Sequence, residues 1–253
     1  MRLLPARASG AALVYLCLLT AGPAAAQQFN SDSYISKPHG MVTTILTTGE
    51  HTTMFMMTFS LFPNWELTAA GYFFNSDADR RTAEGTQLSL YAKYMFYENE
   101  AKTGGFAVKG GTGMKPSYIL DGAGYQTSSQ TWWMNAPATI PFLDNKLSWD
   151  IMPGWSATLN SEGSGNTAWA FTYSTRLAWY PTTPKWSVVG EVFGATGEAS
   201  LDPEYRVGWR WEPNAHVNIA LSYGAKFNGS KGAGWEIGAM LFSPPFLCFS
   251  GCK

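Results

Sequence analysis

Hydrophobic and polar residues alternate along most of this chain, most clearly between residues 204 and 241. In the stretch 205–212 (YRVGWRWE), apolar or aromatic residues alternate with charged residues and a glycine. The stretches 217–226 (VNIALSYGAK) and 235–242 (WEIGAMLF) repeat the pattern. A period of two predicts β-strands with two unlike faces. Because one face is apolar and aromatic while the other carries charges, we expect a sheet that is apolar outside and polar inside, as in a transmembrane β-barrel.

Further segments with strand character follow one another at regular spacing, which predicts a strand count. The expected strands are 41–48, 53–61, 65–74, 86–96, 104–111, 131–140, 146–160, 167–180, 186–195, 205–212, 216–227 and 234–242. Twelve is an even number, as is usual in bacterial single-chain barrels. The predicted fold class is therefore all-β, an antiparallel up-and-down transmembrane β-barrel of about twelve strands.

The connections between these strands alternate in kind. Tight connections with Pro, Asn or Asp are expected at 62–64, 98–103, 142–145, 181–185 and 213–215. Longer ones, mostly rich in Gly, Ser and acidic residues, are expected at 75–84, 113–129, 161–166, 196–204 and 228–234. Short turns at one end and long loops at the other are typical of outer-membrane barrels, with the turns facing the periplasm.

The first 26 residues have the features of a secretory signal peptide. Arg2 and Arg7 precede the apolar run 11–20, and three alanines at 24–26 offer a cleavage site. We therefore expect a removed signal peptide (1–26), an N-terminal segment in the periplasm or the barrel mouth (27–40), the barrel (41–242) and a C-terminal tail (243–253). Export together with a barrel pattern predicts the bacterial cell outer membrane as the location.

Composition fits a membrane-embedded surface and argues against some functions. Charged residues make up 14% of the chain and aromatic residues 15%, whereas about a quarter of an ordinary soluble domain is charged. Removing the two arginines of the signal peptide from 17 basic residues leaves 15, against 18 acidic residues. This negative balance argues against a nucleic-acid partner. The mature cysteines, Cys248 and Cys252, either pair across a short loop or remain two incidental thiols.

The residues give no support for an enzyme. His39, His51 and His216 have no metal-ligand spacing, and no nucleophile elbow or phosphate loop is present. Ser222 lies six residues from His216 on one expected strand, about 20 Å away and too far for a hydrogen bond. We therefore expect no catalytic residues, no metal and no cofactor.

Several strand pairs close on turns of one type, and these turns suggest a family. Phe62-Pro63-Asn64 and Glu212-Pro213-Asn214 resemble turns of bacterial outer-membrane barrels of the transporter type, and more narrowly of the group associated with meta-cleavage pathways of phenol degradation. The likeness covers about 41–242. It implies a narrow channel or passive transporter for small solutes, including aromatic or hydrophobic ones. Such barrels usually end in an aromatic residue, but here eleven residues (SPPFLCFSGCK) follow Phe242.

The partners implied are outer-membrane lipid, small-molecule solutes and the barrel-assembly machinery, and we expect a monomer. An alternative function stays open, a non-conducting barrel with a structural or surface-interaction role.

Alternation also predicts which charged and polar side chains line the lumen. The proposed lumen-lining and selectivity residues are Glu191, Arg206, Arg210, Asn218, Asp150 and Lys93, with Glu66, Lys109, Glu236 and Lys226 as further inward charges. If opposed residue numbers around the turn 213–215 sum to 428, Arg210 faces Asn218. Glu191 is then the nearest expected counter-charge of Arg206 or Arg210.

Overall fold

The computed structural model describes residues 29, 31–35, 37–74, 85–113, 131–159 and 165–246. Its strands are β1 (Val42–Gly49), β2 (Thr52–Phe62), β3 (Trp65–Phe74), β4 (Gly85–Glu98), β5 (Gly105–Gly113), β6 (Thr131–Asn135), β7 (Ala138–Phe142), β8 (Leu147–Ile151), β9 (Gly154–Thr158), β10 (Ala168–Trp179), β11 (Trp186–Gly197), β12 (Leu201–Asn214), β13 (Val217–Lys226) and β14 (Lys231–Phe242). The predicted signal peptide and both cysteines of the tail lie outside the described residues.

Two of the barrel strands are each interrupted at a proline. β6 and β7 are separated by Ala136 and Pro137, and β8 and β9 by Met152 and Pro153. Proline has no N–H to donate to the ladder, so it breaks regular pairing. The backbone N–H of Ala136 still donates to the carbonyl of Pro153 at 2.9 Å. Each pair therefore acts as one bent strand, and the barrel has twelve strands.

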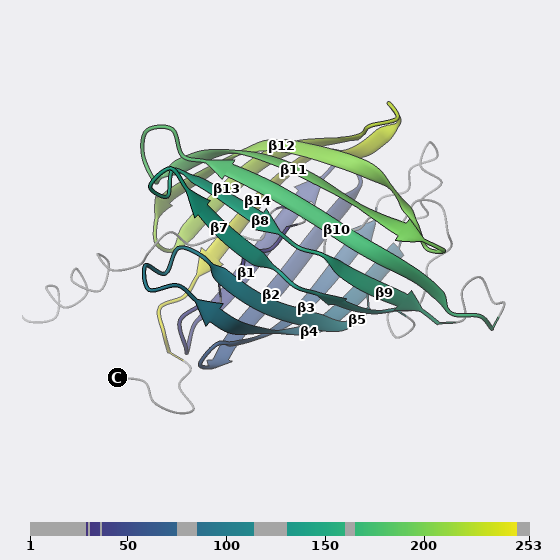
Figure 1. Ribbon diagram of the computed structural model, residues 1–253, viewed down its shortest axis with the longest axis horizontal. Coiled ribbons are helices and arrows are strands. Elements are labelled where there is room, and N and C mark those ends of the chain that lie inside the picture. Colours follow the sequence, from purple (N-terminus) through teal and green to yellow (C-terminus); the bar gives the residue numbers. More distant parts are fainter. Residues whose placement is uncertain are drawn as a thin grey trace, which may run out of the picture.

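When β6 with β7 and β8 with β9 are each counted as one strand, every strand pairs with its sequence neighbour in antiparallel fashion. The sheet closes on itself (Figure 1). β1 pairs with β2 on one side and with β14 on the other, for example through Ile45 and Met240. Closure removes every sheet edge, as a membrane requires. The predicted antiparallel up-and-down barrel of twelve strands is confirmed. In the part of the chain that the structure describes, no helix is long and apolar enough to cross a membrane.

The outer surface of the barrel is apolar. In β12 the exposed side chains are those of Val207, Trp209 and Trp211, whereas Arg206 and Arg210 are buried inside. Exposed aromatics toward one end include Trp132, Trp155, Trp169 and Trp235. Those toward the other end include Phe62, Trp65, Phe142, Trp179 and Trp211. An apolar outer face bounded by aromatic rings suits a bilayer and its two interfaces, and the predicted outer-membrane location is confirmed.

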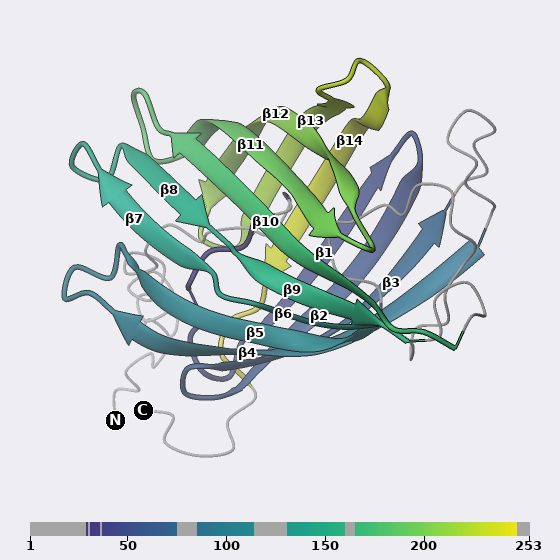
Figure 2. The same cartoon turned by 45° about the vertical axis from the view of Figure 1, so that its right-hand side comes forward.

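The connections at the proline-rich end are short, but the other end differs in part from expectation. The expected loops 196–204 and 228–234 reduce to 198–200 and 227–230, because β12 begins at Leu201 and β14 at Lys231 (Figure 2). Glycine, charge and proline at these positions suggested loops, yet neighbouring strands pair there and extend the ladder. The other long connections, 75–84, 114–130 and 160–164, lie outside the described residues.

The hairpin of β12 and β13 has a register two residues away from the predicted one. Trp211 pairs with Ile219 and Arg210 with Ala220, so opposed numbers sum to 430 and Arg210 does not face Asn218. The shift arises because Asn214 pairs with Val217 across the turn, so their numbers sum to 431, and an irregularity between Trp211 and Asn214 then moves the sum by one to 430. The turn is Ala215-His216, where the His216 N–H donates to Asn214 Oδ1 at 2.8 Å. A shift of two leaves every side chain on its predicted face.

The barrel interior divides into an apolar side and a polar side. Inward side chains of β1, β2, β3 and β14 form a buried cluster of Ile45, Met56, Ala70, Tyr72, Phe74, Met240 and Phe242. The inward charges gather on β3, β4, β5, β8 and β10 to β12, as Glu66, Lys93, Lys109, Asp150, Arg176, Glu191, Arg206 and Arg210. The lumen is therefore mostly polar and contains one apolar cluster on β1, β2, β3 and β14.

Candidate solute-binding lumen

The chain enters its own barrel before the first strand begins. We call residues 29, 31–35 and 37 the inner segment; most of it is buried, and it lies within the barrel (Figure 2). Phe29 packs against the inward residues Ala178, Val189 and Ala220 of three strands. A Cβ at Gly208 would lie 2.9 Å from Phe29 Cζ, so glycine leaves the room that this ring needs. The segment 27–40, expected in the periplasm or the barrel mouth, thus has residues 29 and 31–35 within the lumen.

A buried ionic cluster holds the middle of the inner segment to β3, β4 and β5. Asp32 Oδ2 lies 3.5 Å from Lys93 Nζ and 3.3 Å from Lys109 Nζ. Lys93 also pairs with Glu66 at 2.7 Å and donates to the carbonyl of Ile35 at 2.7 Å. Burial alone would raise the pKa of Asp32, but the nearby cations outweigh it and lower the pKa to about 2. The carboxylate is therefore ionised at any ordinary pH.

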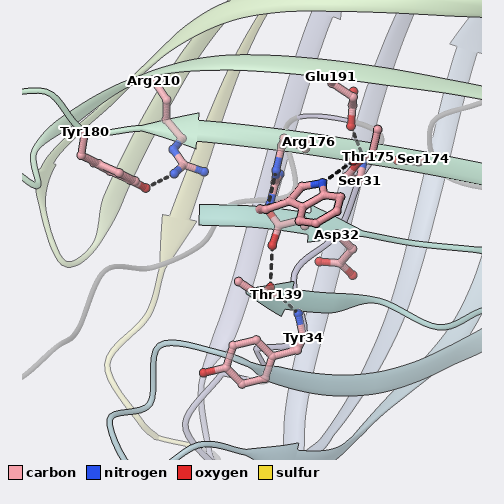
Figure 3. Close-up of polar contacts among 12 residues, drawn as sticks. Ser31, Asp32, Tyr34, Thr139, Ser174, Thr175, Arg176, Tyr180, Glu191 and Arg210 are labelled. Carbon is pink, nitrogen blue, oxygen red and sulfur yellow. Dashed lines mark hydrogen bonds and ion pairs between the residues drawn. The ribbon is translucent and has the colours of Figure 1, made fainter. Parts of the chain in front are cut away.

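Hydrogen bonds to β7, β10 and β11 hold the same segment at another part of the wall (Figure 3). The backbone N–H of Ser31 donates to Glu191 Oε1, and the hydroxyls of Ser31 and Ser174 are hydrogen-bonded to each other. The backbone N–H of Tyr34 donates to Thr139 Oγ1 at 3.3 Å. The inner segment is therefore held at two parts of the lumen wall, by β3–β5 and by β7, β10 and β11.

Asp150 pairs with an arginine that the sequence reasoning did not select. The Nε and Nη2 atoms of Arg176 donate to Asp150 Oδ2 at 2.9 and 2.7 Å, and Thr139 donates to Oδ1. Asp150 and Arg176 are also direct partners across β8 and β10. Arg176 lies on the polar side of the 168–179 alternation, beside Ser174, so the signal was present. Asp32 gave no such signal, because its stretch has no periodicity.

The two arginines of β12 have separate surroundings. Arg206 pairs with Glu236 at 2.7 Å and lies across the ladder from Glu191. Arg210 Nε lies 3.0 Å from Glu212 Oε1, while Nη2 donates to the hydroxyl of Tyr180. The alternation pattern predicted Glu191 as the counter-charge of these arginines. It did not predict their partners Glu236 and Glu212.

All six residues proposed for the lumen are at most 6% exposed and point inward. The structure does not bring them into one ring. Lys93 belongs to the ionic cluster with Asp32. Asp150, Arg176, Glu191 and Arg206 are successive cross-strand partners on β8, β10, β11 and β12. Asn218 lies on β13, two residues from the partner of Arg210. The charges thus form one row across β8 to β12 and a separate cluster at β3 to β5.

A cavity of about 520 Å³ opens the lumen at the end with short turns. Its lining includes Pro63, Asn64, Lys102, Asn145 and Ala215 from those turns, and Ile35 and Lys37 from the inner segment. Arg176, Tyr180 and Arg210 form part of its wall. Because short turns face the periplasm in such barrels, the cavity lies on the periplasmic side of the inner segment. Its volume is within the range of small-molecule sites.

Within the described ranges, no group of three or more His, Cys, Asp or Glu residues is placed to hold a metal ion. The three histidines also have unlike surroundings. His216 closes the turn beside β13, where its Nδ1 lies 3.0 Å from the carbonyl of Phe242.

No protein-family model matches the chain, and no curated protein matches it in sequence. Solved structures do resemble it. The COG4313 outer membrane channel from Pseudomonas putida F1 superposes with a TM-score of 0.54 at 13% identity, covering 83% of this chain and 97% of that one. The KdgM porin gives 0.53 at 10% identity, covering 79% and 98%, both alone and in complex with disordered oligogalacturonate. At these identities the likeness is one of fold, that of outer-membrane barrel channels.

Proposed function

We propose that this outer-membrane barrel is a narrow passive channel for small solutes. The observation that carries the proposal is the charged lumen of a closed barrel, whose periplasmic end is hollowed into a cavity of about 520 Å³. Opposite charges placed in succession along a narrow path set the selectivity of such channels. We assign this role to Glu191, Arg206, Arg210, Asn218, Asp150 and Lys93.

The proposed solutes include small aromatic or hydrophobic molecules. The sequence resemblance to the phenol-degradation group of barrels implies such solutes, and the apolar inner wall of β1, β2, β3 and β14 supports them. A solute with an apolar body can pass along that wall while its polar group meets the charged one. We further propose that the protein is a monomer, that the barrel-assembly machinery inserts it and that outer-membrane lipid surrounds it.

The inner segment favours a second candidate function, a barrel that does not conduct. Its residues are held at two parts of the lumen wall, by Asp32 toward β4 and β5 and by Ser31 toward β10 and β11. A segment in this position narrows or closes the path for solutes. In a channel it must leave or shift, whereas in a structural barrel it stays.

Conductance in planar bilayers separates the two functions. The wild-type mature protein should conduct weakly or intermittently, and deletion of residues 27–37 should raise the mean conductance severalfold, because the lumen loses residues that fill part of it. In the open form, replacing Arg206 with Glu should shift ion preference toward cations. Lys146, exposed in the turn between β7 and β8, supplies the control Lys146→Glu, which should leave ion preference unchanged. A deletion variant that inserts but never conducts would favour the structural barrel.

A further inference from the structure

One buried arginine in the periplasmic cavity has unused hydrogen-bonding capacity. Arg210 is 2% exposed, and its Nη1 has no hydrogen-bond partner among the described residues. Its other contacts are the Tyr180 hydroxyl at Nη2 and Glu212 near Nε. Figure 3 shows one guanidinium nitrogen directed at Tyr180 and another directed away from it, inside the barrel. A buried guanidinium nitrogen without an acceptor is costly, so this atom is the natural place for an acceptor from a ligand.

The charges on the cavity wall favour an anion as that ligand. Its lining holds the cations Lys37, Lys102, Arg176 and Arg210 and the carboxylates Glu98 and Asp150. Arg176 is paired with Asp150 and Arg210 with Glu212. The other lining charges are the cations Lys37 and Lys102 and the carboxylate Glu98, which accepts from the Tyr34 hydroxyl at 3.3 Å. Burial lowers the pKa of Lys37 to about 8, with Glu66 opposing the shift, so this side chain stays mostly charged at pH 7.

The rest of the cavity wall favours a ligand with an apolar body. Its apolar lining consists of Ile35, Pro38, Met41, Pro63, Met95, Pro141 and Phe242. The ring of Tyr180 also lies beside the Arg210 guanidinium, with Cζ 5.5 Å from the ring centroid. Pockets of this composition, mostly apolar with a few placed polar groups, are typical of small-molecule sites.

We propose that the periplasmic cavity binds small carboxylic acids with an apolar body, and that Arg210 Nη1 donates to the carboxylate. Tyr180 and Glu212 hold the guanidinium in place, through a hydrogen bond at Nη2 and an ion pair beside Nε, and Lys37 adds positive charge from the inner segment. Arginine suits this role because its planar fork matches a carboxylate and keeps its charge. The inference rests on the proposed function in so far as the bound acid is the solute that passes.

Calorimetry on the full mature protein in detergent micelles tests the proposal, with benzoate as the probe. Benzoate should bind, and its neutral isostere benzamide should bind at least about tenfold more weakly, because a charge-assisted hydrogen bond is stronger than a neutral one. Replacing Arg210 with Gln should weaken benzoate binding by about tenfold or more. Replacing it with Lys, which keeps the charge opposite Glu212 but loses the fork, should weaken binding less.

Lys146→Gln is the matched control, since Lys146 is an exposed cation at the same end and lies outside the cavity lining. It should change benzoate affinity by less than about twofold, as expected for an exposed charge. A heat-dependent gel shift verifies folding of each variant. If Arg210→Gln does not fold, the benzoate affinity of Arg210→Lys tests the role of Arg210 instead. The proposal is overturned if benzamide binds as tightly as benzoate, if Arg210→Gln binds normally, or if Lys146→Gln weakens binding equally. Benzoate binding without conductance would contradict the proposed channel function and support the carboxylate site. Conductance without benzoate binding would support the channel function and contradict the site.

Discussion

At the scale of single residues, Asp32 has the most demanding environment in the lumen. Its carboxylate stands between the ammonium groups of Lys93 and Lys109, all three almost fully buried. Removing one partner of a buried ion pair leaves an uncompensated charge and costs about 3–5 kcal/mol. Here the cost lowers the free energy that holds the inner segment against the barrel wall, because Asp32 belongs to the segment and the lysines belong to the wall.

We expect Asp32→Asn to release the inner segment while the barrel stays folded. The segment's seating free energy should fall by about 3 kcal/mol, which raises amide hydrogen exchange in residues 31–35 by about 100-fold where exchange reports local opening. Mass spectrometry of the N-terminal peptide measures this rate. Asp202→Asn is the control, because Asp202 is exposed and 3.8 Å from Lys226, and its removal should leave the rate unchanged.

The same carboxylate gives the seat a defined pH dependence. The pKa of Asp32 is 3.8 when the segment is released and about 2 when it is held in the lumen. The carboxylate therefore contributes about 2 kcal/mol to the binding of the segment, and this contribution is complete above pH 4. This contribution is lost as the pH falls from about 4 to about 2, because in that window the released carboxylate takes up a proton and the seated one does not; below about pH 2 both are protonated. Exchange in wild type should therefore rise in that window, and the rise should be smaller in Asp32→Asn.

The sequence predicted which face each lumen residue occupies, but not its partner. Alternation is a property of one strand, so it placed Arg210, Arg206 and Glu191 inside correctly. Partners depend on the register between strands, where the position of the turn and a bulge after Trp211 together moved the pairing by two residues. The lumen position of Asp32 and its lysine partners could not be predicted for a different reason, because an aperiodic segment carries no signal of what it will pack against.

At the scale of elements, the outward faces of β13 and β14 define the depth of the membrane. Ile219 lies beside Trp211 across the ladder, level with aromatic residues of the turn end. Tyr223 and Trp235, whose ring centroids are 5.1 Å apart, mark the other end of the same two strands. Leu221 lies between these levels, opposite Trp209 and Ile237. It is therefore the lipid-facing residue of β13 farthest from both aromatic groups.

Leu221→Arg should destabilise the barrel by about 2–4 kcal/mol, the cost of an arginine on the lipid face near the bilayer middle. The expected cost of Ile219→Arg is smaller, because the cost falls toward the interface. Urea titration in lipid vesicles, followed by tryptophan fluorescence, measures both free energies of unfolding. Ala220→Ser, on the lumen side, is the control and should cost least. Equal losses at residues 220 and 221 would contradict the assignment of faces.

Strand positions were predictable because alternation is strong where one face meets lipid and the other meets water. Strand ends were less so: β12 begins four residues before the predicted strand, in the stretch Leu201–Glu204. The interruptions at Pro137 and Pro153 were also missed, since the apolar residues continue on both sides of each proline. A proline changes the backbone hydrogen bonds without changing the hydropathy pattern.

At the scale of the whole molecule, stability depends on two different surroundings. The outer wall exposes large apolar side chains such as Leu90 and Phe171, which only lipid or detergent can cover. The interior is filled by the inner segment, the ionic cluster and the apolar cluster of β1, β2, β3 and β14. The barrel thus requires a membrane-like solvent outside, while the inner segment fills part of the lumen.

We therefore expect the mature protein to fold only in detergent or lipid. Circular dichroism should show a β-rich spectrum in micelles, and unheated samples should migrate differently from heated samples on gels. Water cannot cover the apolar wall, so dilution into plain buffer should give aggregates. A soluble, monomeric, β-rich protein in plain buffer would refute the membrane assignment.

The inner segment also bears on the order of assembly. Ser31 is seated by Ser174 and Glu191, which follow it by 143 and 160 residues. Contacts that close such long loops form late, after the local hairpins. Until β10 and β11 are in place, the lysines of β4 and β5 face a water-filled groove without Asp32 held between them. The lumen of an incompletely folded barrel is therefore open to water. The inner segment, although it comes first in the described chain, is among the last parts to reach its native contacts.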